Sequence, residues 1–320
     1  MHARFVIVSG SMMGKNQKDG FTIVELLIVV VVIGILAAVT IIAYNGVQNR
    51  AKTATLQSDV SSSLKKIESY RVTTGSDLFP SDLAAAGLIA SSGTTYKYDY
   101  SVEHNAYCLT ATNGTQSYFV SSLSKVVTEG TCVMNFITNP SFEVATTSTW
   151  SENGGRSTSR LARGPTSGSY RIEVTNNSGV VSTILYRQNG NGISFTEGNI
   201  LTVSATVSSV TGNFSSVRMR IDWRNSAGVP TATGTVATGS AVTLTPGEYK
   251  RISLTSTAPP TAAYGRVAIV ADNTPLASVV SIDAVMATSG ATLYPYGDGD
   301  STGWLWFNGA HNSISVGPSS

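Results

Sequence analysis

The sequence is poor in charged residues and in histidine. Asp, Glu, Lys and Arg make up only 12% of the 320 residues, and the net charge is +2, so the chain lacks the basic footprint of a nucleic-acid-binding protein. Only three histidines occur, and neither a nucleophile–His–acid arrangement, a His-Glu-x-x-His motif nor a Gly-rich phosphate loop is suggested. We therefore expect no enzymatic activity and no nucleic-acid partner.

Cysteine is also scarce, with Cys108 and Cys132 as the two examples. No further His or Cys lies near them at metal-ligand spacing, which argues against a zinc site. An even cysteine count in an exported segment favours one disulfide, with two free thiols as the alternative. Closing a loop of about 25 residues would stabilise the fold by about 3 kcal/mol.

Against this background, the apolar stretch 21–43 is the most informative segment. It follows Gly20 and contains one ionisable residue, Glu25. A helix of about 20 apolar residues crosses a bilayer, so we expect a single-pass transmembrane segment. Lys15 and Lys18 precede the stretch, which places the leader in the cytoplasm and the chain after residue 43 outside. The alternative is an ordinary secretory signal, whose apolar region is usually shorter, roughly 7–15 residues.

The order Gly20-Phe21-Thr22-x-x-Glu25 resembles the class III signal of type IV pilins and of the related pseudopilins of type II secretion. The resemblance implies that a prepilin peptidase cleaves between Gly20 and Phe21, so that residues 1–20 form a leader. It also implies N-methylation of the new amine of Phe21. During assembly, Glu25 would pair with the Phe21 amine of a neighbouring pilin subunit, since a buried acid and a buried amine are costly alone and tolerable together.

A stalk helix is expected over residues 21–72, because apolar residues continue at helical spacing beyond the membrane segment. Its stripe consists of Leu56, Val60, Leu64 and Ile67. Alternating segments at 96–102, 106–112 and 116–122 predict the strands of a small head. The resemblance implies a pilin domain over residues 21–133, in which a Cys108–Cys132 bond pins the end of the head onto its sheet. No proline interrupts the stalk near Ile42, where many pilins carry one.

The region after residue 133 has strand-length apolar alternations separated by Gly, Asn and Pro turns. This pattern is typical of a β-sandwich. The expected strands are 170–175, 181–186, 200–207, 217–223, 249–255, 266–271 and 279–286. The predicted fold class is thus α+β: a long N-terminal transmembrane and stalk helix with a small antiparallel-sheet pilin head, followed by an all-β jelly-roll-like sandwich.

Three segments of this region resemble the carbohydrate-binding modules of families 4, 9 and 22. They are 139–143 (Asn-Pro-Ser-Phe-Glu), 167–174 (Ser-Gly-Ser-Tyr-Arg-Ile-Glu-Val) and 282–286 (Ile-Asp-Ala-Val-Met). The resemblance covers residues 134–288 and implies a structural calcium between Glu143 and Asp283, helped by carbonyls of residues 167–169. Calcium takes six to eight oxygens, so the alternative is a pair of turn-capping acids without metal.

The last segment, 289–320, resembles a terminal motif found after such sandwiches in phage tail and cell-surface proteins. Its order is aromatic-Asp-Gly-Asp, then Trp, Gly, His and Ser. Asp298 and Asp300 are more typical of a tight turn than of a cation site. His311 is interpreted as a structural residue.

A charged stripe on the predicted strand 217–224 is the candidate glycan-binding site. Alternation assigns Val217, Met219, Ile221 and Trp223 to the core. The opposite face then carries Arg218, Arg220, Asp222 and Arg224. Planar guanidinium groups suit carboxylates and sugar hydroxyls, so we expect this face to meet acidic or hydroxyl-rich glycans. The alternative is a ladder of ion pairs with acids of neighbouring strands. Aromatic residues available for stacking on sugars are Trp150, Tyr186, Trp223, Tyr249 and Tyr264.

Together these features predict a type IV pilus subunit that displays an adhesive, glycan-binding sandwich at the cell surface. Before assembly it would reside in the inner membrane as a single-pass protein. We expect a minor or tip-located subunit, because such bulk at every repeat would crowd a filament. Two alternatives are a pseudopilin whose sandwich contacts exported cargo, and a structural spacer without ligand. No cofactor is expected apart from the possible calcium.

Overall fold

The computed structural model describes residues 21–144, 149–152, 154, 156–162, 170–309 and 313–319. Gly20 with the rest of the leader, the carbonyls of 167–169 and His311 lie outside the described residues. By its internal contacts the chain divides into two compact units, Met1–Ala51 and Lys52–Ser320. We describe each unit by itself.

Helix α1 (Ile23–Thr74) begins in the first unit and has 52 residues, or about 78 Å at 1.5 Å per residue. It is long and apolar enough to cross a membrane, and its apolar side chains before Val47 are exposed. The helix is followed by Gly75, whose φ of 64° is the left-handed conformation that commonly ends helices. The expected stalk helix is therefore present, shifted by two residues at each end.

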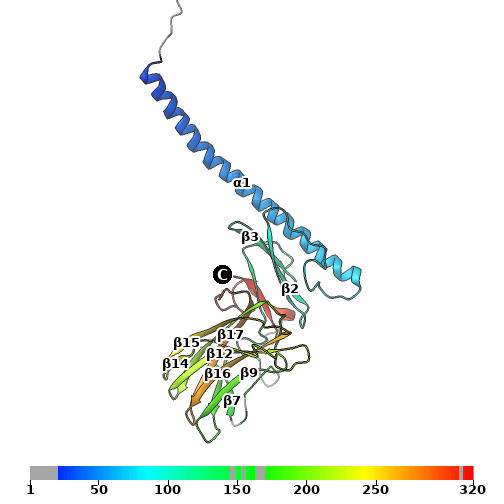
Figure 1. The fold of residues 1–320 in the computed structure, drawn as a ribbon, viewed down its shortest axis with the longest axis vertical. Helices are drawn as coiled ribbons and strands as arrows, with labels where there is room; N and C mark the ends of the chain where they lie inside the picture. The colour runs from blue at the N-terminus through cyan, green and yellow to red at the C-terminus, as the bar shows by residue number, and fades with distance from the viewer. Residues whose placement is uncertain are drawn as a thin grey trace, which may run out of the picture. The chain divides into compact units, whose positions relative to one another are not determined.

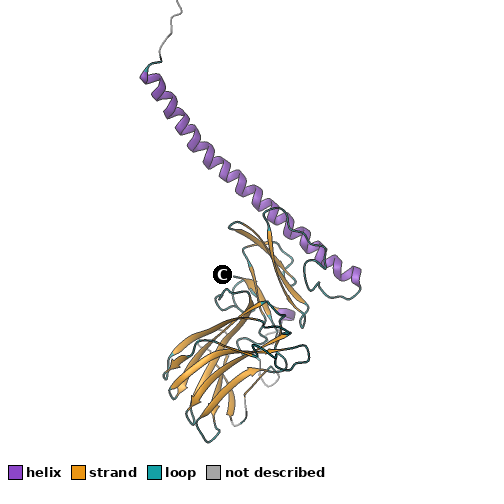
Figure 2. Ribbon diagram, in the orientation of Figure 1, coloured by secondary structure: helices purple, strands orange, loops and turns teal. Residues whose placement is uncertain are grey.

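The second unit contains a four-stranded antiparallel sheet, the head sheet, in the order β1-β2-β3-β4. Its strands are β1 (Thr95–Ser101), β2 (Ala106–Asn113), β3 (Gln116–Ser121) and β4 (Thr128–Glu129). Figure 2 shows this sheet beside the C-terminal part of α1. The predicted head strands are all found, within one residue of the expected positions.

Strand β2 is buried on both faces, which makes it the centre of the head. Alternate residues Tyr107 and Leu109 pack in one cluster with Leu56, Val60 and Ile67 of α1. These three helical residues belong to the predicted apolar stripe and are fully buried. On the other face of β2, Ala106 and Cys108 belong to the large cluster that continues into the sandwich.

The second unit also contains a sandwich of two antiparallel sheets (Figure 1). One sheet has the path β13-β12-β16-β9-β6, and two short strands join it, β10 beside β16 and β14 beside β12. Its strands are β6 (Trp150–Glu152), β9 (Ser182–Gln188), β10 (Ile193–Ser194), β12 (Phe214–Arg224), β13 (Val236–Thr238), β14 (Val242–Leu244) and β16 (Tyr264–Thr274). The other has the order β15-β11-β17-β8-β7: β7 (Arg156–Ala162), β8 (Tyr170–Asn176), β11 (Ile200–Thr211), β15 (Tyr249–Thr257) and β17 (Val279–Ser289).

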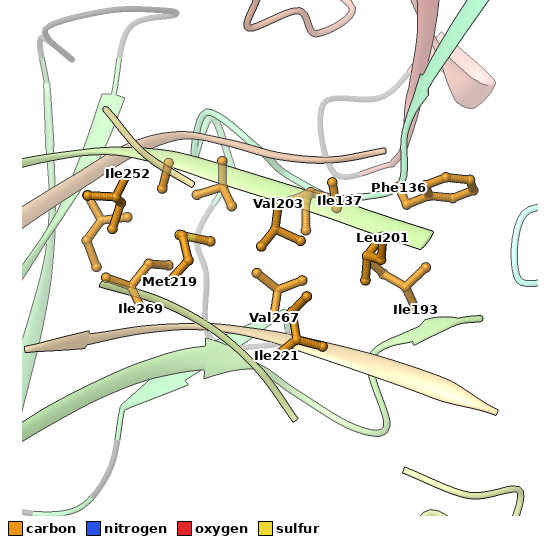
Figure 3. Packing of buried hydrophobic residues seen from close by; sticks show 14 of the residues in the cluster. Phe136, Ile137, Ile193, Leu201, Val203, Met219, Ile221, Ile252, Val267 and Ile269 are labelled. Carbon is orange, nitrogen blue, oxygen red and sulfur yellow. The ribbon is translucent and has the colours of Figure 1, made fainter. Parts of the chain in front are cut away.

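Apolar residues from the two sheets meet between them (Figure 3). Val203 and Ile252 come from one sheet, and Met219, Ile221 and Val267 from the other, and all five are buried. The predicted alternation of strand 217–224 is thus correct, and its polar members point out of the sandwich. Each of the seven strands expected here is present, and each is longer than predicted.

A fourth sheet has three strands in the order β18-β19-β5 and contains the C-terminal strand β19. Its strands are β5 (Cys132–Asn135), β18 (Leu305–Trp306) and β19 (Ser315–Pro318), and a 3-10 turn, η2 (Phe307–Gly309), follows β18. β5 and β19 run antiparallel, with Asn135 opposite Ser315 and Cys132 opposite Pro318. The segment that connects head and sandwich is therefore a paired strand.

Trp304 fills the centre of this C-terminal segment and explains two glycines. A Cβ added at Gly297 would lie 2.2 Å from the Trp304 ring, and one at Gly317 would lie 2.3 Å from it. The indole thus packs directly against two stretches of backbone. Beside it, Asp298 accepts a hydrogen bond from the Tyr296 hydroxyl (2.8 Å) and caps the turn to Ser301, as the tight-turn interpretation predicts.

Candidate functional site

The N-terminal motif forms a helix cap. The Thr22 amide and hydroxyl donate to one carboxylate oxygen of Glu25 at 2.9 and 2.7 Å, and the Glu25 amide donates to the Thr22 hydroxyl at 3.2 Å. This reciprocal arrangement is a capping box, in which two otherwise unpaired amides at the helix start are satisfied. It holds the carboxylate beside Phe21, which is exposed. The sequence analysis missed this role, although Thr-x-x-Glu is its signature.

The disulfide is present between Cys108 of β2 and Cys132 of β5. Both residues are buried, and their Cα atoms lie 5.9 Å apart. The Cys132 amide also donates to the Thr110 hydroxyl at 3.0 Å. The head sheet and the first residue of the connecting strand are therefore joined by a covalent bond as well as by packing.

The predicted stripe on β12 is partly an ion-pair ladder. Arg218 forms an ion pair with Asp272 of the neighbouring strand β16, as the alternative of an ion-pair ladder predicts. Arg220 pairs with Asp222 of its own strand, while Arg224 donates to the Gly228 carbonyl. The four stripe residues thus lie on one face, as predicted, but only some of their donors are engaged by acids.

Two further arginines join this face from adjacent strands. Arg266 of β16 lies opposite Asp222 in register, and the two form an ion pair of 3.0 Å. Arg187 of β9 lies opposite Ala268 of β16, which in turn lies opposite Arg220. We call the set the arginine face: Arg187, Arg218, Arg220, Asp222, Arg224, Arg266 and Asp272. The sequence analysis missed Arg187 and Arg266, because alternation assigns a face within one strand but not which strands are neighbours.

The arginine face carries an excess of positive charge. Its five guanidinium groups share two carboxylates, Asp222 and Asp272. Burial lowers the pKa of Arg187, and the nearby charges of Arg266, Arg224 and Arg220 lower it further, while Asp222 opposes them. Burial and the charge of Arg266 also lower the pKa of Arg224. These cations are therefore held close enough to repel one another.

The candidate stacking aromatics lie mostly in the core. Trp150, Tyr186 and Trp223 are buried, with the Trp150 and Tyr186 rings stacked 5.4 Å apart. Trp223 thus belongs to the core, as the alternation predicts, and burial also corrects the expectation that Trp150 and Tyr186 are available to a sugar, because no face of a core ring is open to a ligand. Tyr249 is half exposed but belongs to the other sheet, on β15. Tyr264 is partly exposed and lies opposite Arg224 in register.

The two acids expected to hold calcium have protein partners. One Glu143 oxygen accepts a hydrogen bond from the Tyr170 amide at 3.2 Å, and one Asp283 oxygen accepts from the Ala284 amide at 2.7 Å. Burial strongly raises the pKa of Tyr296, and the charges of Asp298 and Asp283 add to this effect. Within the described residues, no three acid, His or Cys side chains gather as a metal-binding group. Calcium binding here stays a prediction.

Comparison with protein families gives two matches. Residues 15–41 match the prokaryotic N-terminal methylation motif, and residues 134–275 match a carbohydrate binding domain. A fimbrial protein of Neisseria meningitidis is 34% identical over 98 residues, which cover 31% of this chain and 56% of the relative. The type IV major pilin protein PilE of Neisseria gonorrhoeae is 33% identical over 98 residues, 31% of this chain and 58% of the relative. The chain thus spans little more than half the length of these curated relatives.

Solved structures include similar sandwiches. A xylan-binding domain from Paenibacillus barcinonensis is 13% identical and covers 48% of this chain and 93% of its own, with a TM-score of 0.35. An endo-xylanase of Clostridium thermocellum with a linked binding module is 19% identical and covers 52% of this chain and 29% of its own, with a TM-score of 0.37. The chain is thus similar to type IV pilins over 98 residues, carries the N-terminal methylation motif at residues 15–41, and resembles a carbohydrate binding domain over residues 134–275.

Proposed function

We propose that this protein is a minor or tip-located subunit of a type IV pilus whose sandwich binds a glycan outside the cell. The observation that carries the proposal is the union, in one chain, of a pilin-like N-terminal region and a carbohydrate-binding-domain-like sandwich. The apolar part of α1 would reside in the membrane after peptidase cleavage and enter the filament on assembly with other pilin subunits. The sandwich adds nothing to helix-driven assembly, which favours a role at the surface.

The minor or tip position follows from size. The match to the fimbrial relatives covers 31% of this chain, and the match to a carbohydrate binding domain covers residues 134–275. A domain of this bulk on every subunit would crowd a helical filament, whereas a few copies or a terminal copy would not. A pseudopilin whose sandwich contacts exported cargo, and a spacer without ligand, are the competing functions.

The glycan-binding part is tested with an array of neutral and acidic glycans, probed with the full chain in an uncharged detergent. Selective retention on a glycan class supports the proposal, and retention on none of the glycans favours the spacer. The pilus part is tested by gold labelling of the sandwich on sheared filaments. Label at filament ends or at sparse positions is expected, while continuous label along the filament would contradict a minor role.

Assembly has its own control in the variant Glu25→Val. We expect this variant to be processed by the peptidase but absent from filaments, because it lacks the carboxylate that would pair with a neighbouring amine. Detection of the sandwich in the sheared pilus fraction of wild type, but not of Glu25→Val, would separate filament incorporation from simple membrane residence. Incorporation of the variant at the wild-type level would contradict the proposed assembly contact.

A further inference from the structure

We propose that the arginine face recognises an anionic group of the glycan, a uronate carboxylate or a sulfate, held between Arg187 and Arg220. This inference rests on the proposed glycan-binding function and specifies its ligand. It identifies Arg187 as a binding residue in addition to those of the β12 stripe.

The register of three strands sets the geometry. Arg220, Ala268 and Arg187 lie directly opposite one another on β12, β16 and β9. Neighbouring strands are about 4.8 Å apart, so the two arginine Cα atoms are separated by about 10 Å, with a methyl group between them. Opposed residues share a face, and the core-facing neighbours Ile221, Val267 and Tyr186 confirm which face is inward. The two arginines therefore flank Ala268, which is fully buried beneath the side chains of this face.

The hydrogen-bonding capacity of this face is not used up within the protein. The Arg187 side chain forms no ion pair or hydrogen bond with any residue that the structure describes. The Nε atoms of Arg224 and Arg266 are buried, and neither has an acceptor in the described part of the chain. These two Nε atoms are covered by protein, whereas the Arg187 side chain is partly exposed and its donors are open to an acceptor with several oxygens. Carboxylate and sulfate groups supply such oxygens in the planar or tripodal arrangement that guanidinium forks fit.

The charge of the face distinguishes an anionic ligand from a neutral one. Asp222 is almost buried, with 7% of its side chain exposed, and its two oxygens are taken by Arg220 and Arg266. It therefore orients these cations but does not neutralise the set. The loop of residues 225–235 that follows β12 contains no charged residue, so it supplies no counter-charge. A neutral sugar could accept hydrogen bonds here, but only an anion relieves the mutual repulsion of the guanidinium groups.

The test uses polymers that differ only in charge. The full chain in an uncharged detergent is measured against immobilised polygalacturonate and its methyl ester, and against dextran sulfate and dextran. Arg187→Gln is the main variant, because Arg187 has no ion pair to break and the fold should survive. Lys250→Gln removes one positive charge from β15 of the other sheet, where Lys250 pairs with Glu248, and is the matched control. Melting curves check that both variants are folded.

We expect wild type to prefer at least one charged polymer over its neutral counterpart, and added salt to weaken that binding. Arg187→Gln should bind the preferred polymer about tenfold less tightly, the usual value of one charge-assisted hydrogen bond, with Lys250→Gln unchanged. Preference within the first pair identifies a uronate, and preference within the second a sulfate.

Three results overturn the inference. Equal binding of charged and neutral polymers, unaffected by Arg187→Gln, would leave the glycan-binding proposal intact but assign the contacts elsewhere. Equal losses in Arg187→Gln and Lys250→Gln would show a diffuse effect of net charge. If wild type binds neither charged polymer but is retained by neutral glycans on the array, the anionic ligand class alone is refuted. If wild type binds no glycan at all, the proposed glycan-binding function is refuted as well.

Discussion

Loss of the Cys108–Cys132 bond should destabilise the head sheet and leave the sandwich folded. The two cysteines are 24 residues apart, and the loop they close contains all of β3 and β4. In the chain-entropy model a loop of this length contributes about 3.5 kcal/mol at 25 °C. A change of this size would lower the protection of head-sheet amides against hydrogen exchange by about 300-fold, for amides that exchange through opening of that sheet.

Hydrogen exchange followed by mass spectrometry resolves the effect by segment. Oxidised wild type, reduced wild type and the double variant Cys108→Ala/Cys132→Ala form the series, and the reduced protein keeps both sulfur atoms in place as a packing control. All four tryptophans lie at or after position 150, so their fluorescence reports the sandwich and C-terminal segment independently. Unchanged protection in β2 and β3 after reduction would refute the reasoning, as would an equal loss in β11 and β12 of the sandwich.

Three further outcomes are expected. Mass spectrometry of the mature protein should find methylated Phe21 at the N-terminus, and Gly20→Val should retain the leader; cleavage after Ala38 would be incompatible with the pilin-type signal. If Glu143 and Asp283 share a calcium ion, EDTA should lower the melting temperature by the equivalent of about 2.7 kcal/mol when calcium was at a hundredfold excess over its Kd, and an unchanged value would leave both acids as turn caps. Gly317→Ala should displace the Trp304 ring and lower the free energy of unfolding by about 1–3 kcal/mol, which would be seen as faster carboxypeptidase digestion. Gly154→Ala is the control, because a Cβ at Gly154 meets no atom within 4 Å, and equal digestion of the two variants would contradict this packing.

Local patterns predicted most of the fold. Strand β12 and its inward residue Trp223 follow from alternation, and the stripe of α1 follows from helical spacing, because both signals lie within a single element. The pairing of β5 with β19 could not be found in this way. Its partners are about 180 positions apart, and each strand has only four residues, too few for a periodic signal.

The candidate site shows the same division. Four of its residues share one strand and were predicted together, whereas Arg187 and Arg266 each stand alone on other strands. Their position beside Arg220 and Asp222 depends on strand order, which alternation does not encode. The helix cap formed by Thr22 and Glu25 is a different case. Its Thr-x-x-Glu signature is present in the sequence, but the sequence analysis assigns Glu25 only to a contact between subunits.

The pairing of β5 with β19 brings together the two points at which the chain enters and leaves the sandwich. The chain leaves the connecting strand at Asn135 and returns at Ser315, and these two residues lie opposite each other in an antiparallel pair. Opposed Cα atoms in such a pair are about 5 Å apart, which is the spacing that tolerates insertion of a whole domain. A different sandwich with adjacent ends could occupy the same two attachment points if it also covered Ala106 and Cys108 of the head sheet. Under the proposed function, an exchange of the sandwich would change binding specificity at the surface and leave the filament-building part of the subunit as it is.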